Sequence, residues 1–143
     1  MSARRIIAAS VVLTVILASV GSTSASNKNF SERSLRGAWP FSASGTVGGA
    51  QAAAVGIITF DGAGACTTVA RLNVGGAVSS LTSTTCSYTV NADGTGAITS
   101  TFPGLPQTFL TDLVIVERKE EFLFIISDSA GATVASGVSK RQD

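Results

Sequence analysis

The stretch that decides the fold runs from residue 64 to residue 90 and reads GACTTVARLNVGGAVSSLTSTTCSYTV. It holds both cysteines of the chain, Cys66 and Cys86, on either side of Gly75-Gly76. A three-residue turn over residues 75–77 pairs residues whose numbers sum to 152, which places the cysteines opposite each other. Opposed residues of an antiparallel pair lie about 4.5–5.5 Å apart at Cα, within disulfide range. The sequence therefore predicts a hairpin of residues 66–74 and 84–90, pinned by a Cys66–Cys86 disulfide.

Side-chain alternation supports this pairing, because successive residues of a strand point to opposite faces. In both strands the cysteine lies on the apolar face, which carries Cys66, Ala70, Leu72 and Val74 in the first strand and Cys86, Tyr88 and Val90 in the second. A buried disulfide between the strands requires this arrangement. The apolar face of each strand is therefore expected to point into the protein.

The first 25 residues have the pattern of a signal peptide. Arg4 and Arg5 precede an uncharged apolar run over residues 6–20, and small residues stand before a cleavage site at Ser26. A transmembrane anchor is the alternative, but the run is shorter than the ~20 residues that a bilayer needs. We therefore predict a secreted or periplasmic protein without a stable membrane anchor after cleavage. Oxidising compartments favour a disulfide over the alternative of two free buried thiols.

Charge and composition exclude several functions. Cleavage removes two arginines, so Lys+Arg falls from 10 to 8 against 9 Asp+Glu, and the net charge changes from +1 to −1. This balance gives no reason to bind nucleic acid or an anionic membrane. The chain has no histidine, which excludes a Ser-His-Asp triad and histidine metal sites. With the cysteines paired, no thiolate nucleophile is expected. We predict no cofactor and no metal site.

The remaining chain is divided by turn signals into short segments rich in strand-forming residues. Residues 26–34 are polar and aperiodic and are predicted to form a flexible arm, followed by a single domain over 35–143. Eight strands are expected within it, at 35–47, 52–60, 66–74, 84–90, 96–102, 108–117, 122–128 and 133–140. Short connections between consecutive strands predict an eight-stranded antiparallel up-and-down β-barrel. A barrel of this size leaves room for a small ligand.

The sixth and seventh expected strands are apolar on both faces. Phe109, Leu113 and Ile115 alternate with Leu110, Val114 and Val116, and residues 122–126 are continuously apolar. Strands of this kind are usually covered on both sides. A second copy of the chain is one cover for the outer face, which predicts a homo-oligomer; the amino-terminal arm is the alternative cover.

Asp112 is the candidate for chemistry, because it interrupts this apolar run on the face of Leu110 and Val114. If that face lined a cavity, Asp112 would be a desolvated carboxylate suited to acid or base catalysis, with Arg71 as its partner. The alternative is an outward-facing residue, or one bonded to a neighbouring strand. Trp39, Tyr88 and Phe124 are candidate ligand-binding residues, with plain core packing as the alternative.

Three stretches resemble a known group of proteins. They are LRGAWPF at 35–41, GIITFDGAG at 56–64 and YTVNADGTG at 88–96. They are similar to small secreted bacterial proteins with a G-x-(Y/W)-x-F opening and F-D-G and D-G-T-G turns, which resemble the allene oxide cyclase barrel-like superfamily. The resemblance implies a calycin-like or allene oxide cyclase-like barrel with an apolar central cavity. The superfamily includes plant allene oxide cyclases and bacterial spirotetronate cyclases, but none of their catalytic residues can be matched here.

Three functions follow as hypotheses. The first is a secreted barrel that binds a small apolar ligand or serves as an interaction module. The second is a cofactor-free cyclase or isomerase that uses Asp112 inside the barrel. The third is a structural envelope or extracellular protein without a pocket.

Overall fold

A computed structural model describes residues 29–116 and 120–143. Its elements are a 3₁₀ helix, η1 (Glu32–Leu35), and the strands β1 (Gly37–Val47), β2 (Ala50–Phe60), β3 (Cys66–Val74), β4 (Ala77–Thr82), β5 (Thr85–Val90), β6 (Thr95–Thr101), β7 (Phe109–Ile115), β8 (Glu121–Asp128) and β9 (Thr133–Lys140). The predicted signal peptide, residues 1–25, lies outside the described residues. The prediction of an all-β protein is confirmed.

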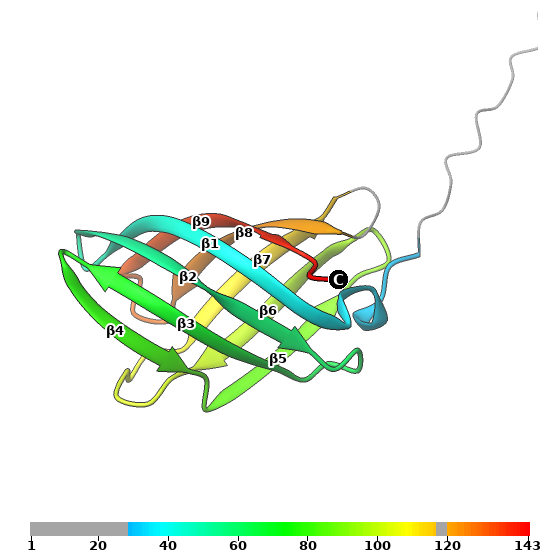
Figure 1. The fold of residues 1–143 in the computed structure, drawn as a ribbon, viewed down its shortest axis with the longest axis horizontal. Coiled ribbons are helices and arrows are strands. Elements are labelled where there is room, and N and C mark those ends of the chain that lie inside the picture. Colours follow the sequence, from blue (N-terminus) through cyan, green and yellow to red (C-terminus); the bar gives the residue numbers. More distant parts are fainter. Residues whose placement is uncertain (1–28, 117–119) are drawn as a thin grey trace, which may run out of the picture.

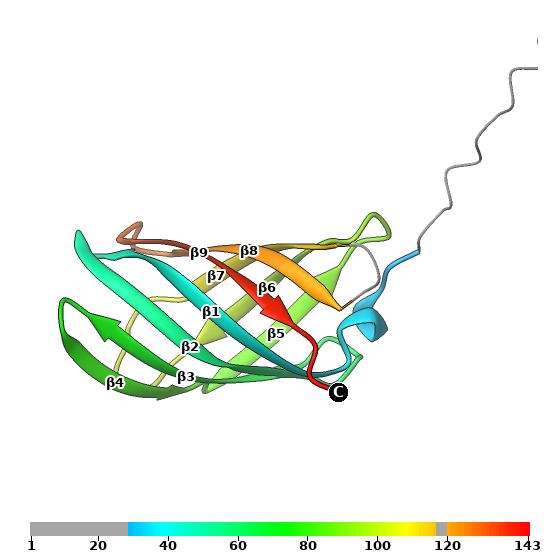
Figure 2. The ribbon, with the colours of Figure 1, turned by 45° about the horizontal axis from the view of Figure 1, so that its top comes forward.

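The strands form one antiparallel sheet in the order β4-β3-β2-β1-β9-β8-β7-β6-β5. The sheet curls into a barrel-like shape, in which β1, β9 and β8 lie across one side and β3, β4 and β5 across the other (Figures 1 and 2). Strands that follow each other in the chain are neighbours in the sheet except β4 and β5, which stand at its two edges, while β9 pairs with β1. The antiparallel up-and-down topology is therefore confirmed in this barrel-like form.

The predicted number of eight strands is wrong, because the described residues contain nine, and β4 is the one that was not expected. β3 pairs with β4 in a register where Val74 faces Ala77. The turn between them contains only Gly75 and Gly76, with φ of 57° and 96°. A two-residue hairpin turn of this type needs positive φ at both central positions, which glycine adopts without strain. The expected three-residue turn, and the pairing of 66–74 with 84–90 as a hairpin, are therefore corrected.

The predicted disulfide between Cys66 and Cys86 is confirmed, with a Cα–Cα distance of 4.9 Å. It joins β3 to β5 instead of closing a hairpin. The line along which the two edges of the curled sheet meet is here called the seam, and the disulfide crosses it. Beside it lie a single bridge between Ala65 and Ser87 and a hydrogen bond from the Tyr88 N–H to the Gly64 carbonyl, 2.9 Å. Near the disulfide, β5 is therefore also joined to the residues that precede β3 by backbone hydrogen bonding.

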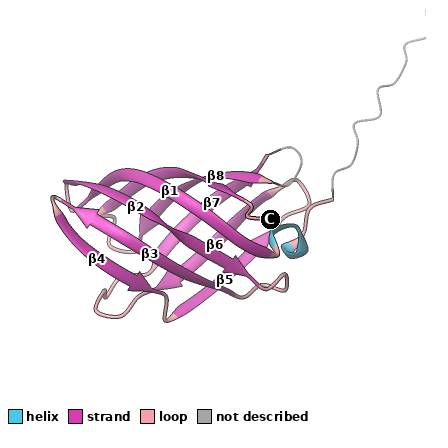
Figure 3. Ribbon diagram, viewed as in Figure 1, coloured by secondary structure: helices cyan, strands magenta, loops and turns pink. Residues whose placement is uncertain are grey.

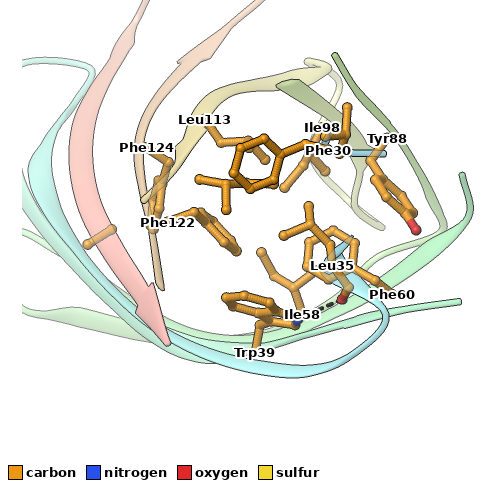
Figure 4. Close-up of a cluster of buried hydrophobic side chains, with 13 residues drawn as sticks. Phe30, Leu35, Trp39, Ile58, Phe60, Tyr88, Ile98, Leu113, Phe122 and Phe124 are labelled. Carbon is orange, nitrogen blue, oxygen red and sulfur yellow. Dashed lines mark hydrogen bonds between the residues drawn. The ribbon is translucent and has the colours of Figure 1, made fainter. Parts of the chain in front are cut away.

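One end of the barrel is packed with large side chains. The cluster consists of Phe30, Leu35, Trp39, Ala43, Ile58, Phe60, Tyr88, Val90, Ile98, Leu113, Ile115, Phe122 and Phe124. Leu35 of η1 enters this cluster, and its carbonyl accepts a hydrogen bond of 2.6 Å from Trp39 Nε1 (Figure 4). The flexible arm was predicted over residues 26–34, of which 26–28 lie outside the described residues. Its described part packs here, because Phe30 and Ser34 are buried. η1 thus plugs this end.

The carboxyl terminus reaches the same end and covers the plug. Figure 3 shows η1 next to the C-terminal end of the chain. The Arg141 guanidinium donates hydrogen bonds to the carbonyls of Ser34, 2.8 Å, and Arg36, 3.2 Å. It also stacks on the ring of Trp39, 5.1 Å from the ring centroid. Both termini of the described fold therefore stabilise the packed end.

Across residues 29–116 and 120–143, no helix combines the length and the apolar character that crossing a membrane requires.

Candidate functional site

The other end of the barrel contains a cavity of about 340 Å³. It is lined by the strand ends farthest from η1 and by the connection between β6 and β7, with Phe41, Val47, Ala54, Ala70, Leu72, Val74, Leu81, Phe102, Leu105, Gln107, Phe109, Phe124, Ile126 and Ala135 among its walls. This volume lies at the lower end of the ~300–1,000 Å³ that is usual for ligand pockets.

The cavity exists because the inward side chains change size along the strands. At the packed end, the inward positions of β1, β2 and β8 carry Trp39, Phe60 and Phe122, which are almost completely buried. Toward the other end, five of the inward positions carry alanine, namely Ala43, Ala52, Ala54, Ala70 and Ala135. A methyl group cannot reach the barrel axis, so space remains there.

Two inward glycines place aromatic rings against the cavity. A Cβ atom on Gly137 of β9 would lie 2.5 Å from Phe124 Cζ and would clash with the Ser42 carbonyl. A Cβ on Gly56 of β2 would lie 2.8 Å from Phe41 Cε1. Glycine in a strand interior allows this close approach and lets the sheet bend. The two rings also contact each other edge to face, with centroids 6.0 Å apart.

Polar groups line one wall beside the disulfide. Thr68 of β3 and Ser100 of β6 face inward, and each is only 7% exposed. Their hydroxyl oxygens lie 3.7 Å and 3.6 Å from Cys86 Sγ, respectively. Of the described residues that line the cavity, none is Asp, Glu, Lys or Arg. The interior is therefore uncharged, with hydroxyl groups on an otherwise apolar surface.

Asp128 is the ionisable group next to this interior. It ends β8 and is 6% exposed, and its Oδ1 accepts hydrogen bonds from the N–H groups of Ala130, 2.8 Å, and Ala132, 3.1 Å. The neighbouring Thr133 hydroxyl, followed by these N–H groups, lowers the pKa of Asp128 against the opposing effect of burial. Asp128 is therefore an anion at neutral pH, and it holds the turn between β8 and β9.

A broader hollow of about 1,000 Å³ lies on the outer face of the sheet. Exposed side chains of β1, β5, β6, β7, β8 and β9 line it, including Ser42, Thr89, Ala97, Asp112, Val114, Leu123, Ile125 and Ser136. The interior cavity is more enclosed than this hollow, and ligand pockets usually bury most of the surface of a small ligand. The hollow is an open part of the surface, so the interior cavity is the better small-molecule site.

The structure separates the residues predicted from the sequence. Phe124 lines the cavity, whereas Trp39 and Tyr88 belong to the packed end and lie outside the lining. Asp112 is exposed on the outer face of β7, and Arg71 is exposed on β3, where it donates to Ser80 Oγ over 2.8 Å. The interior position that acid or base catalysis by Asp112 requires is therefore not found, because the alternation along β7 turns this carboxylate outward.

Sequence reasoning missed most of the cavity wall, including Phe41, Phe109, Thr68 and Ser100. A usable signal was present, because the apolar face of the cysteine strands identifies the inward parity. Extended through the neighbouring strands, that parity selects the alanines at one end. In the described part of the chain, no three His, Cys, Asp or Glu residues gather in a group able to hold a metal ion.

The chain matches no family model. A search of curated proteins also finds no match. Among solved structures, it is similar to a redesigned β-barrel, mFAP1, bound to DFHBI, with a TM-score of 0.58 and 18% identity over 77% of this chain and 97% of that one. EF1p2_mFAP2b bound to DFHBI has a TM-score of 0.55 and 18% identity over 77% of this chain and 95% of that one. The redesigned barrel mFAP0 bound to DFHBI has a TM-score of 0.53 and 17% identity over 76% of this chain and 99% of that one. These likenesses show a β-barrel fold.

Proposed function

We propose that this protein binds a small apolar ligand in its interior cavity. The observation that carries the proposal is the contrast between the two ends of one barrel. Large side chains fill the end near η1, whereas alanines leave about 340 Å³ open at the other end, beside the rings of Phe41 and Phe124. The solved barrels similar in fold are bound to DFHBI, which supports a barrel of this kind as a ligand carrier.

The test is a fluorescence titration with the neutral probe N-phenyl-1-naphthylamine. We expect saturable binding to the wild type and its loss in Ala70→Phe, because Ala70 is an inward residue of the cavity wall. Val69→Phe is the matched control, since the neighbouring Val69 is 53% exposed and points outward. Thermal unfolding verifies that both variants are folded. A signal that does not saturate in the wild type, or that Ala70→Phe leaves unchanged, refutes the proposal.

The location of the protein and its relationship to known families are also proposals. The Cys66–Cys86 disulfide is compatible with an oxidising compartment, which supports a secreted or periplasmic location together with the pattern of residues 1–25. Membership in the allene oxide cyclase barrel-like superfamily rests on the strand and turn motifs of the sequence. The structural role in an envelope or matrix stays an alternative, which saturable ligand binding would disfavour.

Self-association is a second proposal, and the outer faces of β7 and β8 support it. Val114 and Leu123 are directly opposed and about half exposed, at 50% and 51%, and Ile125 is 58% exposed. These three residues, here called the outer apolar patch, border the outer hollow. In the described part of the amino-terminal segment, Phe30 and Leu35 are buried in the core cluster at the barrel end and do not lie on this outer face. We therefore infer that a second copy of the chain covers it.

A further inference from the structure

The wall beside the disulfide indicates which ligands the cavity prefers. Thr68 and Ser100 are both more than nine-tenths buried, and both line the cavity. Within the described part of the chain, the only hydrogen-bond contact of either hydroxyl is with Cys86 Sγ. A divalent sulfur is a weak acceptor. Two cavity-lining residues therefore carry a buried hydroxyl donor without a strong partner, although buried polar groups are normally hydrogen-bonded.

The surroundings of these hydroxyls restrict the charge of a ligand. The described lining contains no cationic side chain that could compensate a carboxylate or phosphate. Asp128 lies next to the lining residue Thr133 and carries a negative charge at neutral pH. An anionic head group would lose its hydration and meet a like charge. A neutral oxygen would instead accept a hydrogen bond from the hydroxyl wall.

We propose that the cavity selects neutral molecules with an apolar body and a carbonyl oxygen, such as ketones, aldehydes or esters, and that Thr68 and Ser100 bind this oxygen. The inference rests on the proposed function of the cavity. The apolar body lies against Phe41, Phe109 and Phe124, and the carbonyl end points to the wall between β3 and β6. Carboxylates of the same shape bind more weakly because of their charge.

The experiment uses three matched competitors of N-phenyl-1-naphthylamine at neutral pH: 2-acetylnaphthalene, 2-ethylnaphthalene and 2-naphthoate. The readout is the ratio of the inhibition constants of the ketone and the hydrocarbon. A substitution that changes the size or shape of the cavity affects both competitors alike, so that it cancels in this ratio. Thr68→Val and Ser100→Ala should shift this ratio against the ketone by roughly 2- to 10-fold, the value of a neutral hydrogen bond. Thr67→Val, an identical change at the neighbouring outward position, should leave the ratio unchanged. The carboxylate should bind the wild type about 10-fold more weakly than the ketone.

Each outcome separates this inference from the proposed function. If all variants keep the wild-type ratio, or if 2-naphthoate competes as well as the ketone, the selection for neutral carbonyl compounds is overturned while ligand binding stands. If no competitor displaces the probe and Ala70→Phe binds it as the wild type does, the proposed function itself fails.

Discussion

At the scale of single residues, Tyr88 offers a direct test of the packed end. Its hydroxyl accepts a hydrogen bond from the Gly62 N–H and donates one to the Glu32 carbonyl, both at 3.0 Å. Burial raises the pKa of Tyr88 above the ordinary value of 10.0, chiefly through desolvation. Because Tyr88 is the one tyrosine of the chain, the ultraviolet absorbance of tyrosinate reports this group alone. We expect a titration midpoint above pH 10.0 in the folded protein and near pH 10 in denaturant.

The sign of the linkage follows from this shift. A raised pKa means that the folded state holds the proton more tightly, so the stabilisation from Tyr88 is complete below pH 10 and is lost as pH rises through the folded value. Tyr88→Phe removes this alkaline decrease and lowers the free energy of unfolding by about 1–3 kcal/mol, because buried partners lose their hydrogen bonds. A folded-state midpoint at or below that of the denatured chain contradicts the prediction.

Residue-level orientation was predictable only where the sequence contains a marker. In β3 and β5 the cysteines identify the inward face, and the observed burial follows it. In β7 both faces are apolar, so alternation alone does not say which one points inward. Asp112 itself indicates the outward face of β7, because burying an unpaired carboxylate costs far more free energy than exposing it to water. Its neighbours on that face, Leu110 and Val114, are accordingly exposed.

At the scale of elements, the seam between β3 and β5 depends on the disulfide. The Cys66–Cys86 bridge spans 20 residues, and a loop of this length should contribute about 3 kcal/mol to the free energy of unfolding. Cys66→Ala with Cys86→Ala should therefore destabilise the protein by about that amount in denaturant titrations. The single variants serve only as a check on unpaired thiols.

The loss should also be local. The amide of Tyr88, bonded to the Gly64 carbonyl, should exchange its hydrogen faster in the double variant, because this bond lies at the seam. The ladder between β1 and β2, which contains Ala43 opposite Ala54, provides the comparison. A uniform rise of exchange in both regions, or an unchanged free energy of unfolding, would show that the disulfide does not hold the seam.

Most elements were predictable, and the missed strand has a physical explanation. β3 and β9 have the expected bounds, and β1, β2 and β5 to β8 differ by a few residues at their ends. β4 was missed because the pairing rule assumed Ala77 in the turn, whereas a glycine pair alone satisfies the two positive φ angles. No glycine or proline separates β4 from β5, so the short break at Ser83 and Thr84 carries no strong sequence signal.

At the scale of the whole molecule, the outer apolar patch predicts a dimer. Sedimentation equilibrium of the wild type should show a concentration-dependent dimer, and Leu123→Lys should shift it to monomer by burying an unpaired charge in the interface. Val55→Lys is the control, because Val55 is 58% exposed on β2, outside the patch. A monomeric wild type at high concentration, or equal effects of both variants, rules out this interface.

The cavity was less predictable than the fold, because it depends on how both ends of the barrel are filled. Turn signals divide the chain, but they do not show that Phe30 and Leu35 enter the barrel from a segment of polar composition. Nor do they show which alanines face inward until the register of each strand is known. Volume is a property of the assembled sheet, whereas periodicity is a property of a segment.

The position of the seam allows the strands to be reordered along the chain. β9 is bonded to β1, both ends of the described fold lie at the packed end, and the two edge strands are β4 and β5. A circular permutant, joined from Asp143 to residue 29 and opened between Ser83 and Thr84, would run β5-β6-β7-β8-β9-β1-β2-β3-β4, so that sequence order and sheet order coincide. In such a chain the Cys66–Cys86 bond would link the first strand to the last hairpin, and every pair of consecutive strands would be neighbours in the sheet.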